Sequence, residues 1–216
     1  MRATFHVAGW LAGLVAALSL LAGCIVGPGS QSNGITVRVS DDKIPLNTPE
    51  RMCGASLVVD AQIAALGPGH WNTPDGSRPP GDAKTISESP YAIYTPLRLS
   101  APHTYLDQRK QPTSTKEFDV IGGTVGADRY IEEDAPHVAV GQRYLLIFIP
   151  GPDLPTHTYT EAWLYLTEAF PIDAQGIVTL QGAHTEEGQN NQIENFPAVT
   201  MPLSQIVQQL ANCPAG

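Results

Sequence analysis

Apolar and polar residues alternate along much of the chain, which is the pattern of half-buried β-strands. In residues 91–100 (YAIYTPLRLS), every second residue from Tyr91 to Leu99 belongs to one face. Residues 143–149 (RYLLIFI) form a continuous apolar run that Pro150 ends, which predicts a central buried strand. The same patterns predict further strands at residues 35–39, 56–66, 117–121, 162–170 and 177–180.

Two segments carry helical signals instead. Thr48, Pro49 and Glu50 are typical of a helix start, because Thr caps, Pro suits the first helical position and Glu favours the positive end of the helix dipole. Near the end of the chain, residues 202–212 place apolar residues three and four apart on one face, which predicts a C-terminal helix. The residues of this face are Leu203, Ile206, Val207 and Leu210.

Short strands separated by Pro- and Gly-rich turns predict a sandwich or a small barrel. We favour a barrel, because Greek-key barrels of this size often carry an added terminal helix. The expected fold is therefore mainly β: a single small, mostly antiparallel, OB-like β-barrel at residues 35–216 with short flanking helices.

The beginning of the chain has the composition of a secretory signal. Arg2 is the only charged residue before Arg38, and an apolar run from Val7 to Leu21 follows it. Small residues then precede Cys24, as before a cleavage site, and the run is short for a membrane-spanning helix. We predict a signal peptide at residues 1–23; the alternatives are an ordinary signal that happens to contain Cys, or an uncleaved anchor.

Leu21-Ala22-Gly23-Cys24 resembles the bacterial lipobox. The resemblance implies that the Cys24 thiol receives a diacylglycerol and that the new amino terminus is acylated, since stable anchoring needs two or more acyl chains. Residues 25–34 (IVGPGSQSNG) have linker composition and reach about 17 Å on average. We therefore expect residues 24–34 to be a lipidated tether that holds the domain at the cell membrane, on its extracytoplasmic side.

Charge and cysteine content narrow the compartment and the partners. After cleavage, eleven basic and 21 acidic residues leave a net charge of about −10, which argues against nucleic acid and against a polybasic membrane contact. Cys53 and Cys213 remain outside the cytoplasm, so a disulfide between them is expected, with two free thiols as the alternative. On the chain-entropy model such a long loop stabilises the fold by roughly 5 kcal/mol.

Two motifs carry a family resemblance: Gly122–Gly126 (GGTVG) and residues 140–148 (VGQRYLLIF). From about Met52 to Leu210 the chain resembles bacterial exported proteins of unknown function that share GGxVG and VGxRYLLFL around a five-stranded, OB-like barrel. The resemblance implies a fold and no activity. A more distant similarity is to netrin-like barrels, some of which inhibit metalloproteases through a free amino-terminal cysteine; acylation of Cys24 conflicts with that mechanism.

Two places are candidates for binding. The segment from Gly67 to Ser89 is long for a loop, and its Trp71 and Arg78 have the composition of an interaction hot spot. The alternative for Trp71 is a lid that closes one end of the barrel. Asp60 interrupts an apolar strand, so it either has a buried partner, as at a functional site, or faces solvent on the outer wall, which we favour.

The remaining motifs favour ordinary structural roles. Gly122, Gly123 and Gly126 predict a turn, because the Lys-Ser/Thr pair of a phosphate-binding loop is missing. The acidic groups at residues 132–134 and 186–187 are interpreted as solvated charge. The five histidines of the mature chain lie in predicted loops without metal-ligand spacing. These are His70, His103, His137, His157 and His184.

The sequence contains no nucleophile motif, metal motif or cofactor motif, so no catalytic residue, metal ligand or cofactor is predicted. We expect a non-enzymatic envelope module that binds a protein, a peptide or a glycan. Two alternatives stay open: a metal-assisted hydrolase that uses loop histidines, and a structural envelope protein without a discrete ligand.

Overall fold

The computed structural model describes residues 33–40, 45–109, 118–151, 164–180 and 198–214. The predicted signal peptide, the lipidation site Cys24 and most of the tether therefore lie outside the described residues. Within the described part, every helix is too short or too polar to cross a bilayer.

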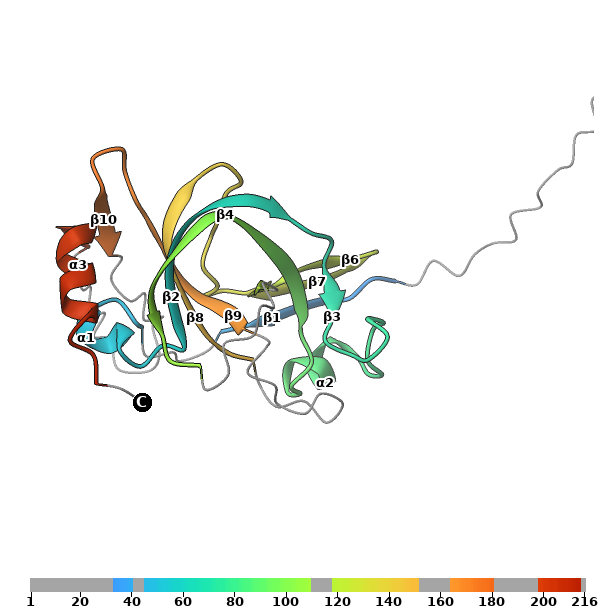
Figure 1. The fold of residues 1–216 in the computed structure, drawn as a ribbon. Helices are drawn as coiled ribbons and strands as arrows, with labels where there is room; N and C mark the ends of the chain where they lie inside the picture. The colour runs from blue at the N-terminus through green and yellow to red at the C-terminus, as the bar shows by residue number, and fades with distance from the viewer. Residues whose placement is uncertain (1–32, 41–44, 110–117, 152–163, 181–197, 215–216) are drawn as a thin grey trace, which may run out of the picture. The chain divides into compact units, whose positions relative to one another are not determined.

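Strands dominate the described residues, and three short helices flank them (Figure 1). The strands are β1 (Thr36–Val39), β2 (Leu57–Leu66), β3 (His70–Trp71), β4 (Ile93–Asp107), β5 (Phe118–Ile121), β6 (Gly123–Val125), β7 (Asp128–Glu132), β8 (Arg143–Pro150), β9 (Leu164–Pro171), β10 (Ile177–Leu180) and β11 (Val199–Pro202). The helices are α1 (Pro49–Met52), α2 (Ala83–Ser87) and α3 (Leu203–Leu210).

Five strands close into a barrel in the order β2-β8-β9-β5-β4, with β4 pairing back onto β2. Read in the other direction, this order is β2-β4-β5-β9-β8. In chain order these are the first, second, third, fifth and fourth strands of the barrel. The pair β5–β9 is parallel and the other barrel pairs are antiparallel. This is the Greek-key arrangement of the OB-fold. The predicted mainly-β, OB-like barrel with a C-terminal helix is confirmed.

The barrel interior is apolar because alternate residues of each strand point inward. Strand β8 illustrates this, since Leu146 and Phe148 lie inside while Leu145 and Ile147 lie outside, and all four are fully buried. The interior cluster consists of Leu57, Val59, Ala61, Ile63, Leu97, Phe118, Val120, Tyr144, Leu146, Phe148, Leu164 and Leu166.

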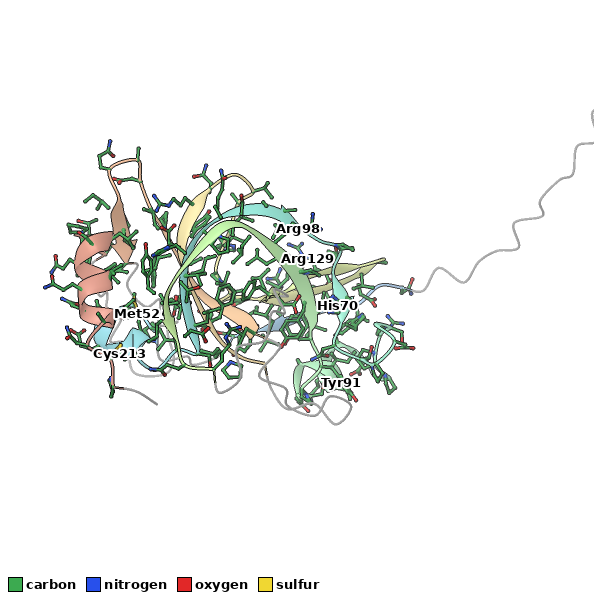
Figure 2. The ribbon with its side chains drawn as sticks, viewed as in Figure 1. Met52, His70, Tyr91, Arg98, Arg129 and Cys213 are labelled. Atoms are coloured by element: carbon green, nitrogen blue, oxygen red, sulfur yellow. A yellow bond between two sulfur atoms is a disulfide. The ribbon has the colours of Figure 1, made fainter. Side chains whose placement is uncertain are left out.

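One part of the outer wall is covered by α1, α3 and the β10–β11 hairpin. Val58, Leu145 and Ile147 point outward from β2 and β8 into this cover, where they pack with Ile206 and Leu210 of α3. Figure 2 shows Met52 of α1 and Cys213 beyond α3 on this side of the barrel. Burial of each aliphatic side chain that β2, β8 and α3 place in this cover contributes about 1.5–3 kcal/mol to the free energy of unfolding.

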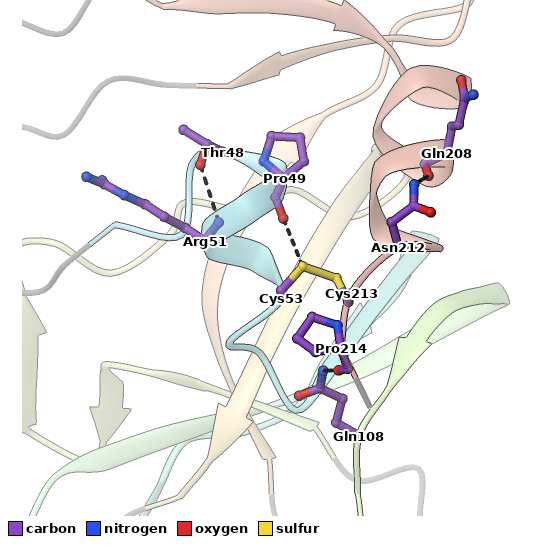
Figure 3. The surroundings of a disulfide bond; sticks show 9 residues. All are labelled: Thr48, Pro49, Arg51, Cys53, Gln108, Gln208, Asn212, Cys213 and Pro214. Atoms are coloured by element: carbon purple, nitrogen blue, oxygen red, sulfur yellow. Dashed lines mark hydrogen bonds between the residues drawn. A yellow bond between two sulfur atoms is a disulfide. The ribbon is translucent and has the colours of Figure 1, made fainter. Parts of the chain in front are cut away.

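A disulfide between Cys53 and Cys213 fastens the cover (Figure 3). It confirms the predicted pairing, and it joins the residue that ends α1 to the turn after α3. Thr48 caps α1 as expected, since its hydroxyl accepts a hydrogen bond from the Arg51 N–H. The two helices therefore hold each other in place over the outer wall.

A second cover lies over another part of the wall and is built from the β1-β7-β6 sheet, β3 and α2. Strand β1 pairs in parallel with β7. Helix α2 is capped by Asp82, whose carboxylate accepts a hydrogen bond from the Thr85 N–H. The strand β1 was predicted from sequence, but residues 67–89 were expected to form a loop. That segment contains β3 and α2, which were missed because each is too short to show a periodic pattern.

Candidate functional site

A β-bulge distorts the barrel where β4 passes β2. Asp60 pairs with His103 and Gln62 pairs with Ser100, so a single β2 residue faces two residues of β4, Ala101 and Pro102. Ala101 has φ +47°, and within the described residues it is alone among non-glycine residues in this left-handed region. Such strain and such bulges concentrate at functional sites, where they redirect side chains.

The bulge changes which face His103 occupies. Leu99 packs against the barrel interior, and strict alternation would also send His103 inward, four residues later. The extra residue reverses the alternation, so His103 lies opposite the outward-facing Asp60. The ring of His103 then meets the ring of Tyr105 edge to face, with 4.8 Å between centroids.

Asp60 is the centre of a polar cluster on this outer wall. Its carboxylate accepts hydrogen bonds from both Nε and Nη2 of Arg143, the former at 2.7 Å, and a third from the Tyr105 hydroxyl at 3.3 Å. Only 7 % of the Asp60 side chain is exposed, whereas 49 % of the Arg143 side chain is exposed. Asp60 lies on the outer wall, but the favoured expectation that it faces solvent is wrong, because Arg143 and Tyr105 bury its carboxylate.

The ionisation of both partners follows from these contacts. The hydrogen bonds to Asp60 raise the pKa of Arg143, which keeps the guanidinium charged. Burial, followed by the negative charge of Asp60, raises the pKa of Tyr105. Tyr105 therefore stays a neutral hydroxyl that donates to the carboxylate.

A shallow depression of about 500 Å³ lies over this cluster. We name it the bulge site and define it by Asp60, Gln62, Ser100, Ala101, His103, Tyr105 and Arg143, with Ala61 at its floor. Gln62, Ser100 and His103 are exposed at its edge, and the Gln62 amide donates to the Gly141 carbonyl at 2.7 Å. The site thus combines three strands, a fixed ion pair and several exposed polar groups.

Another depression, of about 620 Å³, lies on the exposed side of α3. Its lining residues are Ser204, Gln205, Gln208, Gln209 and Asn212. All belong to one helix and its end, and none carries a charge. The bulge site is the better candidate, because a ligand there meets groups from several elements around a charged side chain.

The predicted binding surface at Trp71 is wrong. The Trp71 side chain is completely buried, and its ring meets that of Tyr130 edge to face at 6.5 Å. It packs in the apolar cluster beneath the second cover, which is separate from the cluster inside the barrel. Burial of the large apolar Trp71 ring stabilises the fold, even though its Nε1 has no hydrogen-bond partner within the described residues.

Arg78 lies in the same segment as Trp71 but remains partly exposed. Its Nη1 forms an ion pair with Asp128 at 3.0 Å, and Asp128 also accepts a hydrogen bond from the Ile35 N–H. Arg78 therefore connects the 67–89 segment to β1 and β7. The structure does not bring Arg78 and the side chain of Trp71 together as one exposed surface.

Of the histidines that the structure describes, His70 lies in β3 and His103 in β4, rather than in loops, whereas His137 lies outside the helices and strands. His157 and His184 lie outside the described residues. In the part of the chain that the structure describes, no three His, Cys, Asp or Glu side chains are grouped as metal ligands.

The glycine motif and one acidic group have the following outcomes. Gly122, Gly123 and Gly126 all have positive φ; Gly126 lies in the turn between β6 and β7, as predicted, whereas Gly122 joins β5 to β6 and Gly123 begins β6. At residues 132–134, Glu133 is exposed and pairs loosely with Arg38. Glu132, however, is buried, so its interpretation as solvated charge is wrong. Burial alternates along β7, and Glu132 lies on the same buried face as Asp128 and Tyr130. The acidic pair at residues 186–187 lies outside the described residues.

Comparison of the chain with protein-family models, with curated proteins and with solved structures found no match. The family resemblance drawn from the GGTVG and VGQRYLLIF motifs therefore stays a prediction.

Proposed function

We propose that this chain is a lipid-anchored protein of the bacterial envelope, held on the extracytoplasmic side of a membrane, which binds a ligand at the bulge site without catalysing a reaction. The proposal has two parts, a location and a binding role, and each rests on separate observations.

Export is supported by the sequence before Cys24 and by the disulfide. The apolar run and the lipobox-like Leu21–Cys24 motif are the signals that bacterial lipoproteins carry. A structural disulfide such as Cys53–Cys213 is typical of oxidising compartments outside the cytoplasm. Both observations support the same location.

The start of the folded domain suits a short tether. At Gly34 an added Cβ would collide with the Ala127 carbonyl, so the chain is already packed against the domain there. Strand β1 begins two residues later and pairs with β7. Few residues remain between Cys24 and the fold, and a tether of this length keeps the barrel within a few nanometres of the bilayer.

The observation that carries the binding role is the Asp60–Arg143 pair on the outer wall. A shielded ion pair adds little stability compared with apolar residues of similar size, because removing charges from water is costly. The same strands use apolar residues a few positions away, where helices cover them. A strained bulge and an ion pair in place of that cover support a role in ligand binding over a purely structural one.

In-cell photo-crosslinking tests this proposal. A photoreactive amino acid at Gln62, at the edge of the bulge site, is compared with the same amino acid at Gln208, on the exposed side of α3. We expect a discrete crosslinked product from position 62 and none from position 208. No product from position 62, or equal products from both, would contradict the binding role.

The location is tested by Cys24→Ala. We expect the wild-type chain in the membrane fraction, carrying acyl mass on Cys24, and the variant released from it. Retention of the variant in the membrane would show that the signal acts as an uncleaved anchor.

A further inference from the structure

The guanidinium of Arg143 is only partly used by Asp60. An arginine carries five N–H donors in a planar fork. Asp60 accepts from Nε and from one N–H of Nη2, along one side of the fork. Within the described residues no other partner engages this group, so both hydrogens of Nη1 and the second of Nη2 remain. Half of the side chain is exposed and Arg143 lines the depression, so a ligand bound there can reach this outer edge.

The other exposed groups around this edge also supply donors. Ser100 offers a hydroxyl, His103 a ring N–H and Gln62 the second hydrogen of its amide, and all three side chains are exposed. The one carboxylate of the site, Asp60, is shielded and already accepts three hydrogen bonds. The bulge site therefore presents donors outward and keeps its one carboxylate behind them.

Asp60 and Tyr105 have a positioning role in this arrangement. Two hydrogen bonds along one side of the guanidinium fix its plane, and the Tyr105 hydroxyl holds the carboxylate from another direction. A guanidinium fixed in this way loses little side-chain freedom when a second partner binds its outer edge. Its geometry then matches two oxygens in one plane, as in a carboxylate.

We infer that the bulge site binds a carboxylate group of its ligand, through the outer edge of Arg143 with help from Ser100, Gln62 and His103. The inference rests on the proposed binding function and names the chemistry that this site recognises. A singly charged, planar carboxylate fits better than a phosphate, because the charge of Arg143 is already balanced by Asp60. The chain as a whole is also acidic, which opposes a doubly charged anion.

The test uses the full chain, purified with its lipid in detergent, and follows the Nε–H signal of Arg143 and the side-chain amide of Gln62 by NMR. N-acetylalanine is compared with its neutral amide, and glucuronate with glucose, at matched ionic strength. We expect saturable shifts of both signals with the two acids and none with the neutral molecules. The tighter acid indicates whether a peptide terminus or an acidic sugar carries the group.

Variants sharpen the test. Arg143→Lys keeps a positive charge beside Asp60, so folding is preserved, but it removes the planar fork. The Gln62 signal should then need about tenfold more acid to reach half of its shift, since charge-assisted hydrogen bonds are lost. His103→Gln should weaken binding less. Arg98 and Arg129, both exposed, serve as internal controls whose signals should stay in place.

Equal shifts with acids and neutral molecules, tighter binding of inorganic phosphate than of either acid, or shifts at Arg98 and Arg129 alone would each overturn the inference. A positive crosslink from position 62 combined with any of these results would leave the binding role standing and reject only the carboxylate. Absence of both would reject the binding role as well.

Discussion

The outer wall of β2 and β8 has a covered, apolar half and an open, charged half, although the same two strands form both. Val58 and Leu145 point outward into the helical cover and are completely buried. Two residues further on each strand, moving toward the open half, Asp60 and Arg143 point outward and form an ion pair. The cover therefore stops where the charges begin.

The covered half and the open half contribute differently to stability. The covered half is fastened by a disulfide and excludes water, so its side chains contribute to stability through apolar burial. The open half contains strain at Ala101 and a half-exposed guanidinium, which contribute little to stability. A binding site is expected in the part of a protein where stability has been given up, because function and stability often compete.

The largest effect should come from the disulfide. Replacing both cysteines, Cys53→Ser and Cys213→Ser, frees a loop of 160 positions. On the chain-entropy model the free energy of unfolding should fall by about 5 kcal/mol. Denaturant unfolding of the variant, and of the wild type under reducing conditions, measures this. Agreement between the two supports the bridge as the cause, and an unchanged midpoint would show that the cover holds without it.

A single apolar residue of the covered half should have the next largest effect. Leu145→Ala leaves a cavity between the barrel wall and α3, and we expect a loss of about 3 kcal/mol. Leu66→Ala is the matched control, since Leu66 is 40 % exposed, and should change stability by less than about 0.5 kcal/mol. Similar losses for both variants would mean that the cover is not closely packed.

The ion pair of the open half should matter less for folding. Asp60→Asn weakens two charge-assisted hydrogen bonds, and we expect a loss of about 2 kcal/mol in the free energy of unfolding. The control is Asp107→Asn, because the Asp107 side chain, which pairs with Arg109, is 27 % exposed against 7 % for Asp60; a loss of about 0.5 kcal/mol is expected. If Asp60→Asn costs as much as Leu145→Ala, the pair is chiefly structural and the contrast between the halves fails.

The smallest effect should be a gain. Ala101→Gly relieves the left-handed conformation of the bulge and should raise the free energy of unfolding by about 0.5–1 kcal/mol. Ala64→Gly, at an exposed position of β2, should lower it by a similar amount. Thermal unfolding of the pair compares them directly. A loss of stability in Ala101→Gly would show that the bulge is not strained.

Local sequence patterns predicted most of the barrel. Alternation located β4 and β9, because a strand's side chains point to opposite faces in strict order. Richness in Val, Ile and Leu located β2, and a continuous apolar run located β8. The Thr48 cap and the spacing of apolar residues in α3 are equally local. Local patterns failed for α2 and for the short strands β3, β6, β7 and β11, which form by pairing and packing with other elements.

The candidate site was only half predicted. Asp60 was singled out because a carboxylate inside an apolar strand is unusual, but its sequence neighbours give no sign of its partners. Arg143 and Tyr105 are 83 and 45 positions away along the chain. Trp71 was misplaced for a related reason, since composition alone does not distinguish an exposed aromatic side chain from one packed beneath a neighbouring sheet.

By itself, the sequence determined the strand periods and the start of α1, since these depend on neighbouring residues. It predicted the Cys53–Cys213 pairing on the expectation that Cys24 carries lipid. The tertiary structure alone decided which side chains meet. The order of the barrel strands brings β4 and β8 to either side of β2, and one extra residue at Ala101–Pro102 moves His103 to the outer wall. Contacts of this kind depend on strand register, and register is a property of the closed barrel rather than of any segment.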